Sequence, residues 1–127
     1  MKEDILIIDD EESIRKMLST MLKKQHYSVA TAASGVEALT LLKTNSYQLI
    51  LLDLKMPIMS GTETLREIRK IDRKVPVYII TAFESEYFKE LEEIRKGGIG
   101  FELLRKPIAK DDFLMVVGNL LKKPPSK

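Results

Sequence analysis

Five short apolar runs, separated by segments with helical periodicity, constrain the fold of this chain more than any other feature. In the intervening segments, apolar residues recur every three or four positions, as on one face of a helix. Buried strands that alternate with amphipathic helices are typical of a parallel sheet covered by helices on both faces. The sequence therefore predicts an α/β fold with a doubly wound, five-stranded parallel sheet. The predicted strands are 5–8, 27–31, 49–52, 75–80 and 101–104.

A helix is expected after each strand, and several helix ends have recognisable sequence signals. Ser34 and Glu37 have the spacing of a capping box, in which each side chain bonds the other's backbone amide. Thr62 is expected to open the third helix, 85–96 to form the fourth, and Asp111 to cap the fifth. The residues expected to face the core are Ile14, Met17, Leu18, Met21, Leu22, Leu65, Ile68, Ile71, Phe88, Leu91, Ile94, Phe113, Val116, Val117, Leu120 and Leu121.

The composition limits the chemistry and the number of domains. A chain of 127 residues is long enough for one hydrophobic core, so we expect one domain over 1–123 and a C-terminal stub over 124–127. The chain has no Cys and only one His, which excludes disulfides and clustered-histidine metal sites. This residue, His26, is expected in the turn before the second strand. No apolar run approaches the ~18 residues that a membrane span needs.

The charge pattern bears on location and partners. The acidic residues near the N-terminus stand where a secretory signal would have basic ones, so we expect a cytoplasmic protein that contacts no membrane. The formal net charge is only +2, which argues against direct nucleic-acid binding.

Polar residues stand at the ends of four predicted strands. Asp9 and Asp10 follow the first strand, Asp53 the third, Thr81 the fourth and Lys106 the fifth. Parallel strands place their carboxyl ends along one edge of the sheet, where such folds bind ligands. We therefore expect three carboxylates, one hydroxyl and one ammonium group to converge there.

This combination of groups favours phosphoryl transfer. Three neighbouring carboxylates repel one another and favour a bound cation, and an all-oxygen site with room for water suits Mg²⁺. An Asp carboxylate can attack phosphorus and form an acyl phosphate. A cation, an ammonium group and a hydroxyl can then bind the phosphoryl oxygens. Asp53 is the expected nucleophile because its strand lies at the centre of the predicted sheet.

Four segments together resemble the receiver domain of bacterial two-component response regulators, over residues 4–121. The resemblance implies the flavodoxin-like strand order 2-1-3-4-5 with five flanking helices. It also implies that a sensor histidine kinase donates the phosphoryl group and that a downstream effector protein reads the result. The segments are IIDDEESIRKML, LILLDLKMPIMSG, VYIITA and LLRKPI.

The resemblance assigns roles to individual residues. Asp53 would accept the phosphoryl group, and Asp9, Asp10 and Asp53 would bind Mg²⁺ together with the backbone carbonyl of Lys55. Thr81 would move toward the phosphoryl group on activation. Two further residues of the site would be Lys106, which pairs with the phosphoryl group, and Pro107, which follows a cis peptide in this family.

The sequence departs from the family pattern near the fifth strand. The family usually has an aromatic residue three positions before the strand-five Lys, where this chain has Leu103. Phe101 has the same side-chain parity, so either residue could act as the switch side chain. Lys55 and Phe83 occupy positions that tune the lifetime of the phosphoryl group in the family. The expected fourth helix is acidic and the segment around it is longer than usual.

Two alternatives to a phosphorylation switch are a phosphohydrolase of the haloacid dehalogenase kind and a pseudo-receiver scaffold. The hydrolase usually has a second Asp two positions after the nucleophile, whereas this chain has Lys55. A scaffold would have little reason to keep the acids, the Thr and the Lys together. The switch is the preferred interpretation, and receivers of this family also form phosphorylation-dependent homodimers.

Overall fold

The five predicted strands are present and form one parallel sheet in the order β2-β1-β3-β4-β5. The computed structural model describes residues 2–54, 56–81, 87–105 and 109–121. This strand order confirms the doubly wound fold. The strands are β1 (Lys2–Ile8), β2 (Val29–Ala32), β3 (Ser46–Asp53), β4 (Val77–Thr81) and β5 (Glu102–Arg105). The helices are α1 (Glu12–Lys24), α2 (Gly35–Thr44), α3 (Gly61–Ile71), α4 (Phe88–Lys96) and α5 (Lys110–Leu121).

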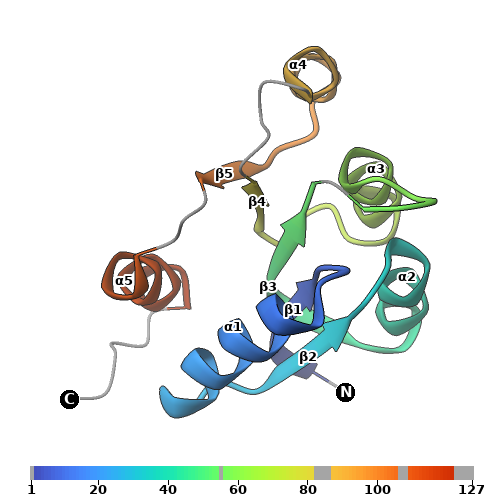
Figure 1. Ribbon diagram of the computed structural model, residues 1–127. Coiled ribbons are helices and arrows are strands. Elements are labelled where there is room, and N and C mark those ends of the chain that lie inside the picture. Colours follow the sequence, from blue (N-terminus) through green and yellow to red (C-terminus); the bar gives the residue numbers. More distant parts are fainter. Residues whose placement is uncertain (1, 55, 82–86, 106–108, 122–127) are drawn as a thin grey trace.

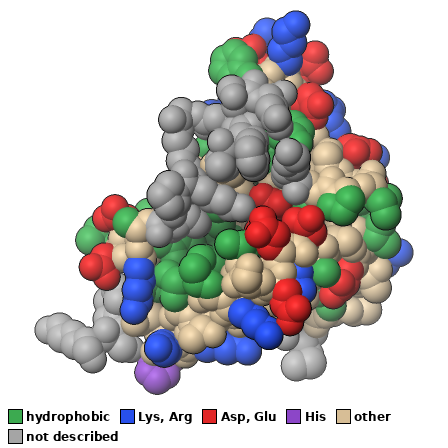
Figure 2. Space-filling model, viewed as in Figure 1, with side chains coloured by type: hydrophobic (Ala, Val, Ile, Leu, Met, Phe, Trp, Pro, Cys, Tyr) green, Lys and Arg blue, Asp and Glu red, His purple; other side chains and the backbone are tan. Residues whose placement is uncertain are grey.

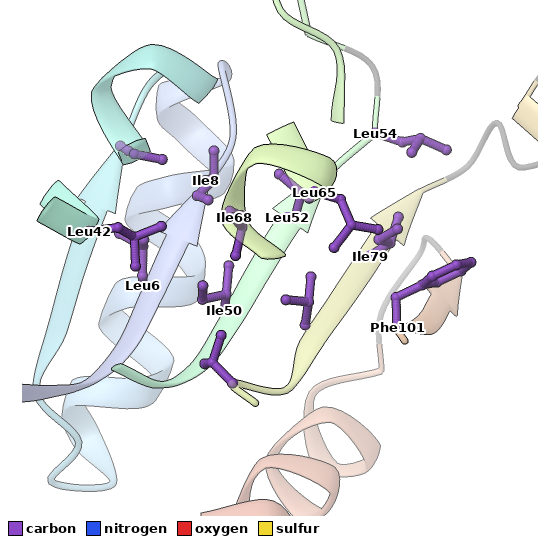
Figure 3. Packing of buried hydrophobic residues seen from close by; sticks show 14 of the residues in the cluster. Leu6, Ile8, Leu42, Ile50, Leu52, Leu54, Leu65, Ile68, Ile79 and Phe101 are labelled. Carbon is purple, nitrogen blue, oxygen red and sulfur yellow. The ribbon is translucent and has the colours of Figure 1, made fainter. Parts of the chain in front are cut away.

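Helices cover both faces of the sheet, with α1 and α5 on one side and α2 and α3 on the other (Figure 1). Leu65 and Ile68 of α3 pack with Ile50 and Leu52 of β3 in the core of the α2–α3 side (Figure 3). A second core lies under α1 and α5, where Leu18 and Phe113 pack with alternate strand residues. Residues of β3 are buried on both faces, which explains why that strand appears as one continuous apolar run.

Two strands begin two residues later than predicted. Tyr27 belongs to the turn after α1, because its amide donates to the carbonyl of Leu22, and His26 lies in this turn as predicted. Strand β4 begins at Val77 because Pro76 has no amide hydrogen for the ladder. The carbonyl of Pro76 still accepts a hydrogen bond from the amide of Ile50, at 2.9 Å.

The helix caps differ in detail from the sequence predictions. The Ser34 side chain accepts from the Glu37 amide at 3.1 Å, but the Glu37 carboxylate accepts from Ala33 instead of Ser34. Helix α3 is opened by a capping box of Ser60 and Glu63, so the prediction that Thr62 opens it was wrong. Helix α5 begins at Lys110, which places Asp111 in its first turn instead of at its cap.

Three predicted core residues are exposed. Met17 and Ile71 are each 46% exposed, and Phe88 is 59% exposed. Ile71 and Phe88 are the last residue of α3 and the first residue of α4, so they lie at helix ends beyond the buried stripe. Met17 lies beside Leu18, which takes the core position in that turn of α1. Across the described part of the chain, no helix combines the length and the apolar character that a membrane span requires.

Candidate functional site

The turn that follows β1 holds Asp9 in a defined position. The Asp9 amide donates to the carbonyl of Ala32, and its carboxylate Oδ1 accepts from the Glu11 amide at 2.9 Å. The Nη1 atom of Arg15, one turn into α1, donates to the Asp9 carbonyl at 2.7 Å. Asp9 is buried and Asp10 is exposed, so the turn presents one fixed and one solvated carboxylate.

The end of β3 is held by a close approach of α3. Gly61, the first residue of α3, donates its amide to the carbonyl of Leu54 at 2.9 Å. A Cβ atom at Gly61 would lie 2.5 Å from the carbonyl oxygen of Asp53 and 2.6 Å from Cα of Leu54. Only glycine fits there, and its backbone supports the chain directly beside Asp53.

Asp9, Asp10 and Asp53 come together at the carboxyl edge of the sheet. One carboxylate oxygen from each lies within 4.8 Å of the other two. Acidic side chains gather near the middle of the face shown in Figure 2. Asp9 and Asp53 are 3% and 6% exposed, so two of the three negative charges are largely removed from water. An all-oxygen donor set with this charge fits a hard divalent cation such as Mg²⁺.

The structure describes Thr81, Phe101 and Leu103 among the other predicted site residues, and four more lie outside its described part. Thr81 ends β4 and is 1% exposed; its neighbour Ile80 pairs with Asp53 in the register of β3 and β4. Phe101 is buried and Leu103 is partly buried, and both pack on the α2–α3 side of the sheet, as their shared parity predicts. The predicted residues that lie outside the described part of the chain are Lys55, Phe83, Lys106 and Pro107.

Comparison with known proteins identifies the family. The model of the response regulator receiver domain matches residues 5–117. The chain belongs to this family. A receiver is a signalling domain and not a conventional enzyme, and response regulators pair with histidine kinases and with effectors. No comparison favours the phosphohydrolase or the scaffold.

Similar proteins include both short and long regulators. The chain is 38% identical over 95 residues to sporulation initiation phosphotransferase F of Bacillus subtilis, covering 74% of this chain and 77% of that protein. It is 34% identical over 117 residues to the regulatory protein AtoC of Escherichia coli, covering 92% of this chain and 25% of AtoC. The chain also spans only 32% of the ycf27 regulator of Cyanidium caldarium.

Solved receiver structures have the same fold. The chemotaxis protein CheY4 of Vibrio cholerae superposes with a TM-score of 0.80 at 30% identity, covering 94% of this chain and 99% of CheY4. The strand order observed here is therefore the one that this family predicts.

Sequence reasoning missed a side-chain link between α3 and α4 of this receiver. The buried Thr62 hydroxyl donates to the Glu90 carboxylate of α4 at 2.5 Å and also contacts the Ser60 hydroxyl at 3.0 Å. These residues lie 28 positions apart, and neither belongs to a family motif quoted above. The link joins α4 to the helix whose first residue supports the backbone beside Asp53.

The loop that precedes α3 in this receiver contains an unfavourable backbone conformation. Ile58 has φ +67° and is 99% exposed, although left-handed conformations disfavour β-branched residues. We expect Ile58→Gly to raise the free energy of unfolding by about 0.5–1 kcal/mol, after the larger unfolded-state entropy of glycine is subtracted. Urea denaturation measures this change. Ile58→Val, which keeps the β-branch, should leave stability nearly unchanged, and an equal gain in both variants would contradict the backbone explanation.

Proposed function

We propose that Asp53 accepts a phosphoryl group from a phosphohistidine on a sensor histidine kinase. The convergence of Asp9, Asp10 and Asp53 within 4.8 Å supports this most directly. Their mutual repulsion favours a bound cation, so these three residues would hold Mg²⁺. By the family resemblance, the backbone carbonyl of Lys55 would be a further ligand.

The chemical step is a transfer between two covalent partners. A carboxylate oxygen of Asp53 forms a bond to phosphorus while the P–N bond of the phosphohistidine breaks. The imidazole leaves with the electron pair and takes up a proton, and Asp53 becomes an acyl phosphate. Asp9, Asp10 and Asp53 would hold Mg²⁺, which would neutralise part of the negative charge on the phosphoryl oxygens. Later attack by water releases inorganic phosphate and restores Asp53, so the domain would also support its own dephosphorylation.

The family resemblance and the position of Asp53 in the sheet favour it over Asp9 as the nucleophile. Oδ1 of Asp9 accepts from the Glu11 amide, and its backbone is held by Ala32 and Arg15. Asp9 is thus arranged as a fixed ligand. Asp53 is the last residue of the central strand.

The proposed output is a change in the partner-binding surface. The acyl phosphate adds close to two negative charges beside the end of β3. Thr81, buried at the end of β4, and Lys106 are the groups proposed to respond to them. The Thr62–Glu90 hydrogen bond offers a route from the site to α4. The protein would thus act as a cytoplasmic receiver over 1–123. It would bind an effector protein or a second copy of itself and would not contact DNA.

Incubation with a small phosphodonor tests the function. With phosphoramidate and Mg²⁺, we expect mass spectrometry to show one phosphoryl adduct, and EDTA to prevent it. Borohydride reduction of the adduct followed by peptide mapping should identify Asp53 as the modified residue. The proposal fails if no adduct forms under these conditions, if the adduct forms equally in EDTA, or if another residue carries it.

A further inference from the structure

A second concave site lies at the opposite edge of the sheet from Asp53. It is a cavity of about 610 Å³ between the C-terminal part of α3 and the turn that follows α4. One wall comes from α3 and the residues just after it, and the other from 97–100, before β5. The lining residues that matter here are Arg66, Arg69, Lys70, Arg73, Gly98 and Gly100.

The α3 wall of this cavity is strongly cationic. It carries three arginines and one lysine but a single carboxylate, Glu67. The Glu67 carboxylate is paired with Lys70 at 2.8 Å. No ion pair involves Arg66 or Arg73 within the described parts of the chain, and both side chains are exposed. The cavity therefore presents two guanidinium groups that can bind an anion.

Arg69 fixes the shape of the cavity and adds a partly buried charge. Its Nη1 atom donates to the Val75 carbonyl at 2.6 Å, and its Nη2 atom donates to the Gly100 carbonyl at 2.9 Å. The guanidinium thus bridges the two walls. Its Nε atom is buried and has no hydrogen-bond partner among the residues that the structure describes. Burial lowers the pKa of Arg69 and the nearby Asp72 carboxylate acts in the opposite direction, so this charge is already partly balanced and Arg69 serves to hold the two walls together.

The facing wall contains Gly98 and Gly100, so at these two positions it presents only backbone to the cavity. A Cβ atom built at Gly98 or at Gly100 would meet nothing within 4 Å, so this wall is open to a ligand. Gly98 has φ +88°, a conformation that other residues rarely adopt. A flat ring can approach such a wall closely, while guanidinium groups bind phosphate oxygens in pairs. Cavities of about 300–1,000 Å³ are the size that small ligands occupy.

The geometry points to a pocket for a nucleoside diphosphate at this edge, in which the exposed guanidinium groups of Arg66 and Arg73 bind the phosphates and the side-chain-free wall at Gly98 and Gly100 leaves room for the base. Cations often lie at helix C-termini because of the helix dipole, and Arg69 and Lys70 are in the last turn of α3. Arg66 lies before that turn and Arg73 lies beyond the helix, so the dipole does not account for them.

A comparable groove on α1 has its cations already engaged. Lys16 pairs with Glu12 at 3.1 Å, and Arg15 donates to the Asp9 carbonyl. Only Lys23 of the cations that line this groove lacks such a contact within the described residues. The α3 cavity is therefore the better anion site of the two.

Titration with ADP in EDTA tests the pocket without any contribution from a metal bound to Asp9, Asp10 and Asp53. We expect calorimetry to detect ADP binding, and NMR amide shifts to change at Gly97, Gly98 and Gly100. The double variant Arg66→Gln/Arg73→Gln should bind ADP about tenfold more weakly or worse, because it removes both exposed guanidinium groups. Inorganic pyrophosphate should bind at the same residues but more weakly than ADP.

The matched control is Lys23→Gln/Lys24→Gln, which removes the same charge from exposed positions in the last turn of α1. It should bind ADP as the wild type does, and both double variants should keep the phosphoramidate reaction at Asp53. Equal loss in both variants would show a long-range charge effect and overturn the site. Unchanged glycine amides, or binding of a DNA duplex but not of ADP, would overturn it as well.

Discussion

Asp53→Asn is expected to abolish the phosphoryl adduct and, in metal-free buffer, to raise the free energy of unfolding. The adduct is lost because a carboxamide is not a nucleophile toward phosphorus. Stability rises because Asp53 is 6% exposed and its carboxylate lies within 4.8 Å of those of Asp9 and Asp10. Removal of one of three neighbouring negative charges relieves a repulsion of about 3–4 kcal/mol for each of two charge pairs at an effective dielectric constant of about 20.

Urea denaturation in EDTA and in Mg²⁺ separates the two effects of this substitution. In EDTA the variant should be more stable than the wild type. Added Mg²⁺ should stabilise the wild type by binding its native state and should stabilise the variant much less, so the difference shrinks. Glu92→Gln removes one exposed charge from α4 and should show neither effect. A destabilised Asp53→Asn protein in EDTA would contradict the repulsion argument.

The alternation of strands and helices along the chain and their layering could be predicted because periodicity reports burial directly, whereas the strand order 2-1-3-4-5 came from the family resemblance. The run at Leu49–Leu52 is apolar on both faces, and only a central parallel strand requires that. Boundaries were harder to predict, because they depend on single hydrogen bonds. Tyr27 has the kind of side chain that is common in strands, yet its amide donates to the carbonyl of Leu22 in a turn. Asp111 has the chemistry of a cap, but α5 begins one residue earlier.

The acidic cluster could be predicted because topology alone brings strand ends together. Asp9 and Asp10 follow β1 and Asp53 ends the neighbouring strand β3, so their approach needs no knowledge of side-chain packing. The supports of the site could not be predicted in this way. The bond from Arg15 to the Asp9 carbonyl and the link from Thr62 to Glu90 depend on how helices pack. The same holds for the cationic cavity between α3 and the glycine turn.

Gly61→Ala is expected to destabilise the domain by about 3 kcal/mol or more, because the new methyl group meets backbone that cannot move cheaply. The Cβ atom would lie 2.5 Å from the carbonyl oxygen of Asp53 and 2.6 Å from Cα of Leu54. Gly61 is the first residue of α3, where alanine has no intrinsic disadvantage as a helix former. Any loss of stability therefore reports the steric conflict and not helix propensity.

Urea denaturation of Gly61→Ala beside Gly100→Ala makes the test specific. A Cβ atom at Gly100 meets nothing within 4 Å, so that control should stay within about 0.5 kcal/mol of the wild type. Because α3 would have to move away from the end of β3, Gly61→Ala should also weaken Mg²⁺ binding, measured by calorimetry on the protein that remains folded. Similar stabilities for the two variants would mean that α3 does not set the position of Asp53. Loss of stability without weaker Mg²⁺ binding would mean that the helix supports the fold and leaves the carboxylates in place.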